Sequence, residues 1–227
     1  MAQAYSTPEL LGPLSDFESK NAPDSIYLTG DRKLLTEGRR IAVVGSRKVS
    51  PEGAARARAF TQALVRHHYV VVSGLAEGVD TIAHETAIAE GGRTIAVLGT
   101  PLDQAYPAKN RELLETIKRN HLALSQFPEG YPSKRENFPR RNRTMALITD
   151  ATVIVEAGEK SGTRHQGWEA LRLGRLVFIM QNVADDPELT WPQEMIGYGA
   201  QVLTRESLPD ILDDIPSFTA SGAELAL

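Results

Sequence analysis

Small residues and one arginine gather where several apolar runs of the chain end. Gly45-Ser46-Arg47, Ser73-Gly74 and Gly99-Thr100 each follow such a run directly, and Ser161-Gly162-Thr163 comes a few residues after another. Glycine lets a phosphate approach the backbone, hydroxyl groups donate hydrogen bonds to it, and arginine adds a forked cation. Any single loop could contain glycine only because tight turns need it. Several such loops at one edge of a sheet predict a site for a phosphate-bearing ligand.

A second cluster mixes basic residues with an aromatic one. Between Lys134 and Arg143 the sequence has five basic residues, one glutamate and one phenylalanine, Phe138. In single-strand binding, cations follow the phosphates while an aromatic ring stacks on a base. The alternative is a solvated helix start in which Phe138 packs into the core. The cluster therefore indicates a single-stranded nucleic acid as ligand and leaves the core role of Phe138 open.

Several other kinds of chemistry lack the residues they need. The chain has no cysteine, which excludes disulfides, thiolate metal sites and a cysteine nucleophile. Residues 45–50 do not form the G-x-G-x-x-G of dinucleotide enzymes, and no Walker A motif occurs. Asp80 and His84 have a helical spacing that suits a metal, but no further ligand stands near them, so a helix cap and a hydrogen bond are favoured. We expect no cofactor, no metal and no catalytic residue.

The elements that position these residues follow from the hydrophobic pattern. Continuous apolar runs predict buried strands, and the segments between them have helical features such as a proline in the first turn. We expect strands at 41–44, 70–72, 94–98, 122–124, 151–155, 176–179 and 202–203. We expect helices at 51–66, 80–90, 110–119, 138–149, 167–173 and 207–212. This alternation predicts an extended Rossmann-like, doubly wound α/β fold with a mostly parallel sheet and helices on both faces.

Pattern and charge divide the chain into three parts. Residues 1–38 are interpreted as a lead-in segment with one short strand, residues 39–205 as the Rossmann domain, and residues 206–227 as an acidic, mobile tail. From Ala184 onward nine residues are acidic and one is basic, whereas the whole chain has a formal net charge of −4, so the body of the chain is net basic. No apolar run approaches the roughly 18 residues of a membrane helix. We therefore expect a cytoplasmic protein without membrane contact.

Six short motifs occur in order along the chain. They are V-V-G-S-R (43–47), V-V-S-G-L-A-x-G-V-D-x-x-A-H (71–84), T-I-A-V-L-G (94–99), D-x-x-Y-P-x-x-N-x-x-L (103–113), F-P-x-R-N-R (138–143) and V-I-V-E-A-G-E-K-S-G-T (153–163). Each is weak alone, but together they resemble the Rossmann domain of the DNA-processing protein A (DprA/Smf) family, roughly from Ile26 to Ile179. The resemblance implies a protein that binds single-stranded DNA without catalysis, forms a homodimer, and helps to load the RecA recombinase in natural transformation.

The resemblance also implies roles for individual residues. Arg47 is expected to contact phosphate, Phe138 to face a base, and Arg141 to line the pocket. The full expected DNA-binding set is Gly45, Ser46, Arg47, Ser73, Gly74, Lys134, Arg135, Phe138, Arg141, Asn142, Ser161, Gly162 and Thr163. Two departures argue against an anion at two of the loops. Glu77 stands where the family usually has a basic residue, and Arg164-His165-Gln166 stands where an apolar stretch is usual.

Two other functions could use the same sheet edge. One is a sensor that binds a nucleotide-derived signal. The other is a nucleotide N-glycosidase resembling the LOG-type phosphoribohydrolases. Their P-G-G-x-G-T-x-x-E signature is absent, although Ser161-Gly162-Thr163 followed by Glu169 is a distant echo of it. Release of a base from a nucleoside monophosphate would distinguish the enzyme from a DNA-binding protein.

Overall fold

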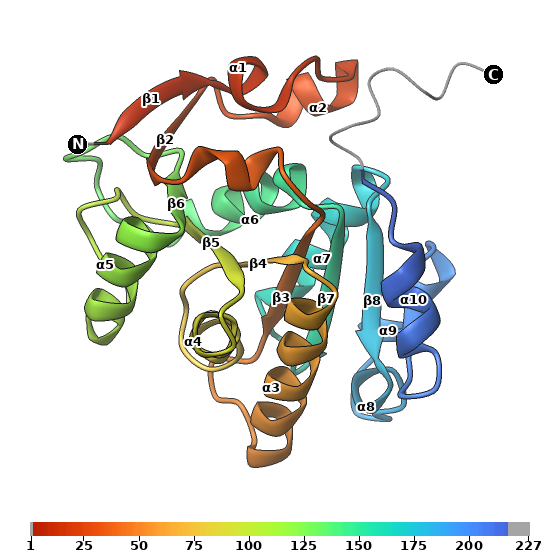
Figure 1. Cartoon of the computed structure of the whole chain (residues 1–227). Helices are drawn as coiled ribbons and strands as arrows, with labels where there is room; N and C mark the ends of the chain where they lie inside the picture. Colours follow the sequence, from red (N-terminus) through yellow and green to blue (C-terminus); the bar gives the residue numbers. More distant parts are fainter. Residues whose placement is uncertain (1, 218–227) are drawn as a thin grey trace.

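The computed structural model describes residues 2–217, and its strands within that range form one nine-stranded sheet (Figure 1). The strand order is β1-β2-β6-β5-β4-β3-β7-β8-β9. The β1–β2 and β2–β6 pairs are antiparallel and the other pairs are parallel. The strands are β1 (Gln3–Ser6), β2 (Ser25–Gly30), β3 (Arg40–Gly45), β4 (Val70–Ser73), β5 (Arg93–Leu98), β6 (Leu122–Ser125), β7 (Ala151–Glu156), β8 (Leu176–Met180) and β9 (Gln201–Leu203).

Helices connect most of the parallel strands and cover both faces of the sheet. They are α1 (Thr7–Leu11), α2 (Asp16–Asn21), α3 (Pro51–Arg66), α4 (Val79–Ala89), α5 (Arg111–Asn120), α6 (Asn137–Ile148), α7 (Thr163–Arg172), α8 (Gln181–Ala184), α9 (Trp191–Gly197) and α10 (Leu208–Asp214). Two short 3₁₀ helices are η1 (Arg32–Leu35) and η2 (Ala108–Asn110). The mostly parallel, doubly wound sheet confirms the predicted fold class.

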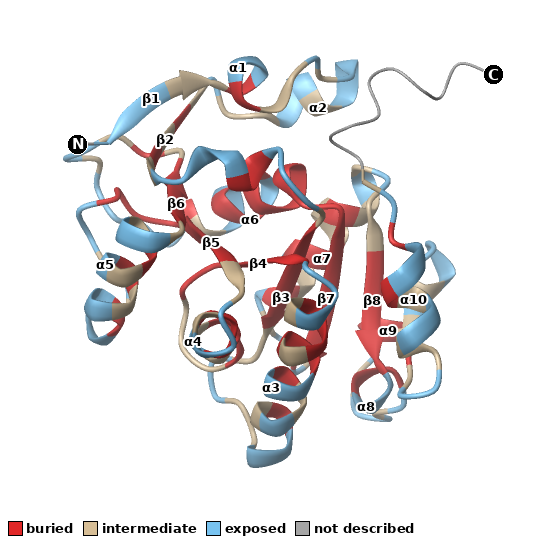
Figure 2. Ribbon diagram, viewed as in Figure 1, coloured by how far each residue is buried: buried red, intermediate tan, exposed pale blue. Residues whose placement is uncertain are grey.

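The core lies on the two faces of the sheet because successive strand residues point to opposite sides. On one face Ile41 and Val43 of β3 pack with buried residues of α3, such as Phe60. On the other face Ala42 and Val44 of the same strand pack in a cluster that includes residues of α6. Figure 2 shows β3, β4 and β7 as almost continuously buried. Such strands, apolar on both faces, explain why continuous hydrophobic runs predict a central parallel sheet.

The direction in which the chain adds strands to the sheet reverses at β3. The chain proceeds from β3 through β4 and β5 to β6 on one side, and then returns to place β7 on the other side of β3. The carboxyl ends of β3 and β7 therefore flank a topological switch point, which is where ligands bind in open α/β sheets.

Residues 1–38 form more structure than the expected single strand. The expected strand is present as β2, but β1 pairs with it and extends the sheet, and α1 and α2 lie between them. These helices have only five and six residues, too few for a helical period to be detected in the sequence. Ser-x-x-Glu capping boxes start both of them, at Ser6 and Ser15, and this pattern was the available signal.

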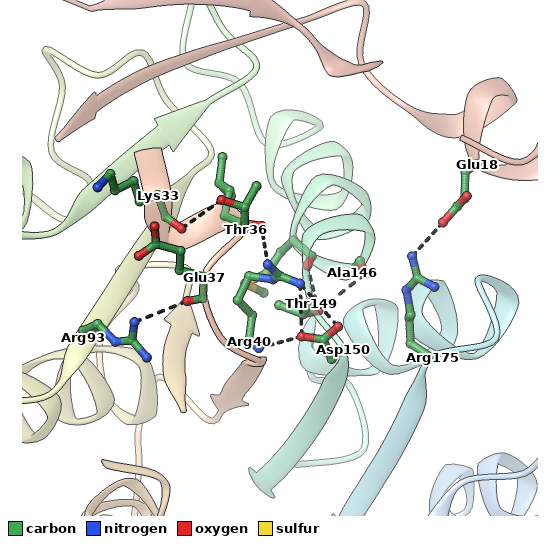
Figure 3. A network of polar contacts seen from close by, with 12 residues as sticks. Glu18, Lys33, Thr36, Glu37, Arg40, Arg93, Ala146, Thr149, Asp150 and Arg175 are labelled. Carbon is green, nitrogen blue, oxygen red and sulfur yellow. Dashed lines mark hydrogen bonds and ion pairs between the residues drawn. The ribbon is translucent and has the colours of Figure 1, made fainter. Parts of the chain in front are cut away.

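A buried polar network lies at the amino ends of β3 and β7 (Figure 3). The Arg40 guanidinium donates to both Asp150 carboxylate oxygens, at 3.2 and 3.3 Å, and to the Leu35 carbonyl, and both charged side chains are fully buried. Burial lowers the pKa of Arg40, and the Asp150 carboxylate opposes that shift. Nearby, Glu18 of α2 accepts a hydrogen bond from Arg175 at 2.6 Å. The network ties the N-terminal segment to the central strands.

The C-terminal part of the described chain ends with α10, which was expected at 207–212 and spans Leu208–Asp214. Residues 218–227, the last part of the expected mobile tail, lie outside the described residues. In the part of the chain that is described, no helix has the length and apolar character needed to span a membrane.

Candidate functional site

A cavity of about 610 Å³ opens at the switch point between β3 and β7. It is lined by the loop after β3, the loop before α6, α6 as far as Met145, and the loop after β7 with the start of α7, together with Ala76 after β4 and Asp80 at the start of α4. The structure brings ten of the predicted site residues together in its wall: Gly45, Ser46, Arg47, Arg135, Phe138, Arg141, Asn142, Ser161, Gly162 and Thr163. Segments more than a hundred residues apart in the sequence therefore share one site.

The loop that carries Arg47 is fixed at both ends by Glu156, the last residue of β7. The Glu156 carbonyl accepts a hydrogen bond from the Ser46 amide at 2.7 Å. The Glu156 carboxylate accepts from the Ser50 amide at 3.0 Å and from its hydroxyl at 2.5 Å. Arg47 itself is exposed. The loop thus presents an exposed cationic side chain on an anchored backbone.

Phe138 lies in the first turn of α6, which spans Asn137–Ile148 where a helix was expected at 138–149. Pro139 is the third residue of the helix, where an amide N–H has no partner within the helix and its loss costs little. The half-buried Phe138 ring is 5.2 Å from the Tyr106 ring, and the Arg47 guanidinium lies 5.7 Å from its centroid. Phe138 therefore offers the cavity a partly covered ring.

Arg141 lines the cavity but is buried, and its Nε and Nη1 atoms donate hydrogen bonds within the protein. It donates to the Gly74 and Val97 carbonyls, at 2.5 and 2.8 Å, and to Asn142 Oδ1 at 2.9 Å. Burial lowers the pKa of Arg141, and Asp80 opposes that shift. Burial likewise raises the pKa of Asp80, against the effect of Arg141. Two buried side chains of opposite charge, which influence each other electrostatically, are therefore part of the cavity wall.

Three predicted residues lie outside the cavity wall. Ser73 is buried and donates to the Val43 carbonyl at 2.7 Å, and Gly74 lies behind the wall, against the Arg141 guanidinium. Lys134 is exposed and lies 3.8 Å from Glu136. Ser73 and Gly74 support the site from behind. Their position at the end of β4 places them at the predicted edge of the sheet, but both residues lie behind those that line the cavity.

The loop after β7 leads directly into α7, which begins at Thr163 and not at 167. Thr163 donates to the Gly45 carbonyl at 3.1 Å, which joins this loop to the Arg47 loop. The segment Arg164-His165-Gln166 is therefore the first turn of a helix, and His165 and Gln166 line the cavity. The sequence shows these residues only as a departure from the family pattern and does not indicate that His165 and Gln166 belong to the site.

The cavity has an excess of positive charge. Its wall includes the exposed cations Arg47, Lys48, Arg135 and Lys160, and its one carboxylate among the described residues is Asp80, which is buried. Lys48 and Lys160 were also missed, although Lys48 directly follows the motif at 43–47 and Lys160 lies within the motif at 153–163. Glu77, the residue that weakened the prediction of an anion, does not line the cavity and pairs with Lys109 at 2.9 Å.

The side chains of Asp80 and His84 have separate hydrogen-bond partners and do not form a common metal site. Asp80 accepts from the amides of Gly74 and Ala76 at 3.1 and 3.3 Å, while His84 Nδ1 is 2.7 Å from Thr94 Oγ1. No cluster of three metal-ligating side chains occurs among residues 2–217. Fold and site together define a Rossmann-type protein with an open cationic cavity at its switch point.

The chain belongs to the DNA recombination-mediator protein A family, whose model matches residues 5–216. This match confirms the resemblance found in the six motifs. The chain is 32% identical to DNA processing protein DprA of Bacillus subtilis, over 86% of this chain and 65% of that protein. It is 37% identical to the Streptococcus pneumoniae protein of the same name, over 82% and 66%, and 40% identical to Protein Smf of Synechocystis, over 74% and 42%. The match thus spans less than two thirds of each relative.

Solved structures show the same relationship in three dimensions. The X-ray structure of DNA processing protein A from Streptococcus pneumoniae has a TM-score of 0.80 at 33% identity, covering 95% of this chain and 75% of that one. The Helicobacter pylori protein, whose structure is described as showing a unique single-stranded DNA binding mode, has a TM-score of 0.79 at 26% identity, covering 95% and 97%. A molybdenum cofactor binding protein from Rippkaea orientalis shares the fold alone, at 19% identity and a TM-score of 0.55.

Proposed function

We propose that this protein binds single-stranded DNA in the switch-point cavity and acts as a recombination mediator. The observation that carries the proposal is the pairing of exposed cations with the half-buried Phe138 ring in one cavity wall. Cations at a cavity mouth attract phosphates, and an aromatic ring in the wall stacks on a base. The Helicobacter pylori relative, described as binding single-stranded DNA, supports the same ligand here.

The cavity favours a single strand over a duplex on geometric grounds. Phe138 lies within the wall and is only half exposed, so a base must leave its stack to reach the ring. Bases of a single strand can do this at little cost, whereas a duplex base must first be unpaired. We therefore expect weaker binding of duplex DNA.

The wider role follows from the family. We infer that the protein acts in the cytoplasm as a homodimer, hands the bound strand to a RecA-type recombinase, and thereby supports DNA processing in natural transformation. The description of the family as a recombination mediator supports this role. Binding and transfer of a strand require no bond to be broken, so we propose no catalytic step.

The glycosidase alternative lacks its key carboxylate in the cavity. Glu169, the residue that echoes the LOG-type signature, does not line the cavity. Its carboxylate accepts from Arg143 at 3.2 Å and from Arg172 at 3.1 Å. A carboxylate paired with two arginines outside the site is not placed to act on a bound nucleotide.

A salt-dependent titration tests the proposed function. Affinity for oligothymidine should fall with salt at a log–log slope of about −0.7 per phosphate contact. Arg47→Ala should weaken binding of all single strands uniformly and flatten that slope, because it removes a cation at the cavity mouth. Duplex DNA and a nucleoside monophosphate are the comparison ligands. Salt-independent affinity, or equal affinity for duplex DNA, would show that the proposal is wrong.

A further inference from the structure

A second depression lies on the other side of α6. It is a polar groove of about 410 Å³. One wall carries Arg140 and Arg143 of α6, together with Gln126 after β6. The opposite wall is the N-terminal segment from Asn21 to Ser25, with Tyr27. Residues 1–38 therefore complete a surface feature as well as extend the sheet.

Neighbouring side chains hold the two arginines of the groove in place. Arg140 Nη1 donates to the Tyr131 hydroxyl at 3.2 Å, and its guanidinium lies 5.1 Å from the centroid of the Phe127 ring. Arg143 Nε donates to Glu169 at 3.2 Å, and its side chain remains half exposed. A guanidinium has five N–H groups, so each arginine keeps donors for a ligand. Held in this way, the two cations lose less freedom when an anion binds.

The other wall of the groove is also anchored. The Thr7 hydroxyl donates to the Pro23 carbonyl, and Glu18 of α2 pairs with Arg175 at 2.6 Å (Figure 3). Among the described residues, Asp24 is the one carboxylate in the lining. Two arginines, one aspartate and several neutral polar groups suit a polar anionic ligand and exclude an apolar one.

The groove and the cavity share one helix. Phe138, Arg141 and Asn142 of α6 line the cavity, whereas Arg140 and Arg143 line the groove. A helix with its side chains is about 10–12 Å wide, and five residues advance about 8 Å along it. A strand that leaves the cavity therefore has to cross only one helix to reach the groove.

We propose that the single strand bound in the cavity continues over α6, and that Arg140 and Arg143 bind its phosphates in the groove. This inference rests on the proposed function and extends it to longer ligands. A short oligonucleotide fills the cavity alone, whereas a longer one occupies both sites. Asp24 limits the affinity of the groove because its charge repels the phosphates.

The test compares oligothymidines of about 4 and about 16 nucleotides, which span the site sizes of single-strand binding folds. Arg140→Ala/Arg143→Ala should leave the short ligand unaffected. It should weaken the long one and make its log–log salt slope shallower by about 0.7 for each phosphate that the groove no longer binds. Asp24→Asn should strengthen binding of the long ligand alone. A matched control is Arg111→Ala/Arg119→Ala on α5, whose buried residues pack on the other face of the sheet from those of α6, and it should change neither affinity.

The outcomes separate this inference from the proposed function. If the double variant binds the long ligand as the wild type does, or loses both ligands equally, the groove proposal is overturned while cavity binding stands. If wild-type protein binds neither length, or Arg47→Ala has no effect on either, the proposed function itself fails. Thermal melts show whether the double variant is folded. If it is not, Asp24→Asn decides, and unchanged affinity for the long ligand overturns the proposal.

Discussion

At the scale of single residues, the contact between Arg47 and Phe138 is the most consequential feature of the site. The sequence predicts separate roles, with Arg47 on phosphate and Phe138 on a base. In the structure the Arg47 guanidinium lies 5.7 Å from the centroid of the Phe138 ring. A cation on an aromatic face contributes about 0.5–1 kcal/mol at exposed sites. The two residues should therefore act as a coupled pair.

Phe138→Ala tests this coupling. If the ring stacks on a base, the substitution should cost roughly 1–3 kcal/mol of binding with little change in the salt slope. Because Phe138 is half-buried, the loss of folding stability should be smaller than the about 3–5 kcal/mol typical of a core phenylalanine. Titrations and thermal melts of the single variants and of Arg47→Ala/Phe138→Ala measure both quantities.

The double variant carries the decisive comparison. Its loss of binding should differ from the sum of the two single losses, because each substitution removes the same contact. Strict additivity would show that the two residues act independently. A large fall in melting temperature, with affinity intact in the folded fraction, would instead make Phe138 a core residue.

At the scale of elements, the position of the Arg47 loop depends on a close approach between α3 and β7. Glu156 lies beside the start of α3, where it accepts from Ser50 and lies 3.7 Å from Arg56. A Cβ atom at Gly53 would lie 2.1 Å from Glu156 Oε2. An alanine at this helical position would therefore force the Glu156 carboxylate to shift, although alanine is normally the better helix former by about 1 kcal/mol.

Gly53→Ala should lower both the melting temperature and the affinity for single-stranded DNA, because it displaces the anchor of the Arg47 loop. Gly197→Ala is the matched control, since a Cβ at this position in α9 meets no atom within 4 Å, and it should be neutral or stabilising. Melts and titrations of both variants provide the measurement. In the Glu156→Ala background Gly53→Ala should cost less, because only Val49 Cγ2, at 2.9 Å, remains of the close neighbours. An equal loss in that background would mean that the carboxylate is not the cause.

The sequence is most informative for helices and strands that have a continuous hydrophobic pattern. The run Ile41-Ala42-Val43-Val44 predicts β3, and α3 has its predicted bounds of 51–66. The short helices of residues 1–38 escape detection because their stability comes from caps and tertiary contacts. The burial of Arg141 also cannot be predicted from the sequence, because an arginine close to two other arginines is expected to be exposed to solvent. Its partners Gly74 and Val97 come close only in the folded sheet.

At the scale of the whole molecule, one buried histidine makes folding sensitive to acid. His84 is fully buried. Its Nδ1 atom lies 2.7 Å from Thr94 Oγ1, and the Thr94 hydroxyl also contacts the Val71 carbonyl at 2.8 Å. Its Nε2 atom has no hydrogen-bond partner among the described residues. Burial lowers the pKa of His84 from 6.5 to about 3, so the folded protein holds this ring neutral.

The free energy of unfolding should therefore fall as the pH falls from 6.5 towards about 3. In this range the unfolded chain binds a proton at His84 and the folded chain does not, which costs about 1.4 kcal/mol per pH unit. Denaturant unfolding of the wild type and of His84→Gln at several pH values isolates this contribution from the carboxylates. The stability difference between the two proteins should shrink as the pH falls. A difference that is constant with pH would contradict a neutral buried ring.

The two ends of the sheet limit how the molecule can associate. Its outermost strands, β1 and β9, have only four and three residues. Short edge strands expose few unpaired backbone groups, which makes them poor templates for another strand. Polymerisation through backbone pairing, the route by which open sheets grow into fibrils, is thereby discouraged at both edges. A second copy or another protein would instead have to recognise side chains on the helical surfaces, and such contacts can evolve without extending the sheet.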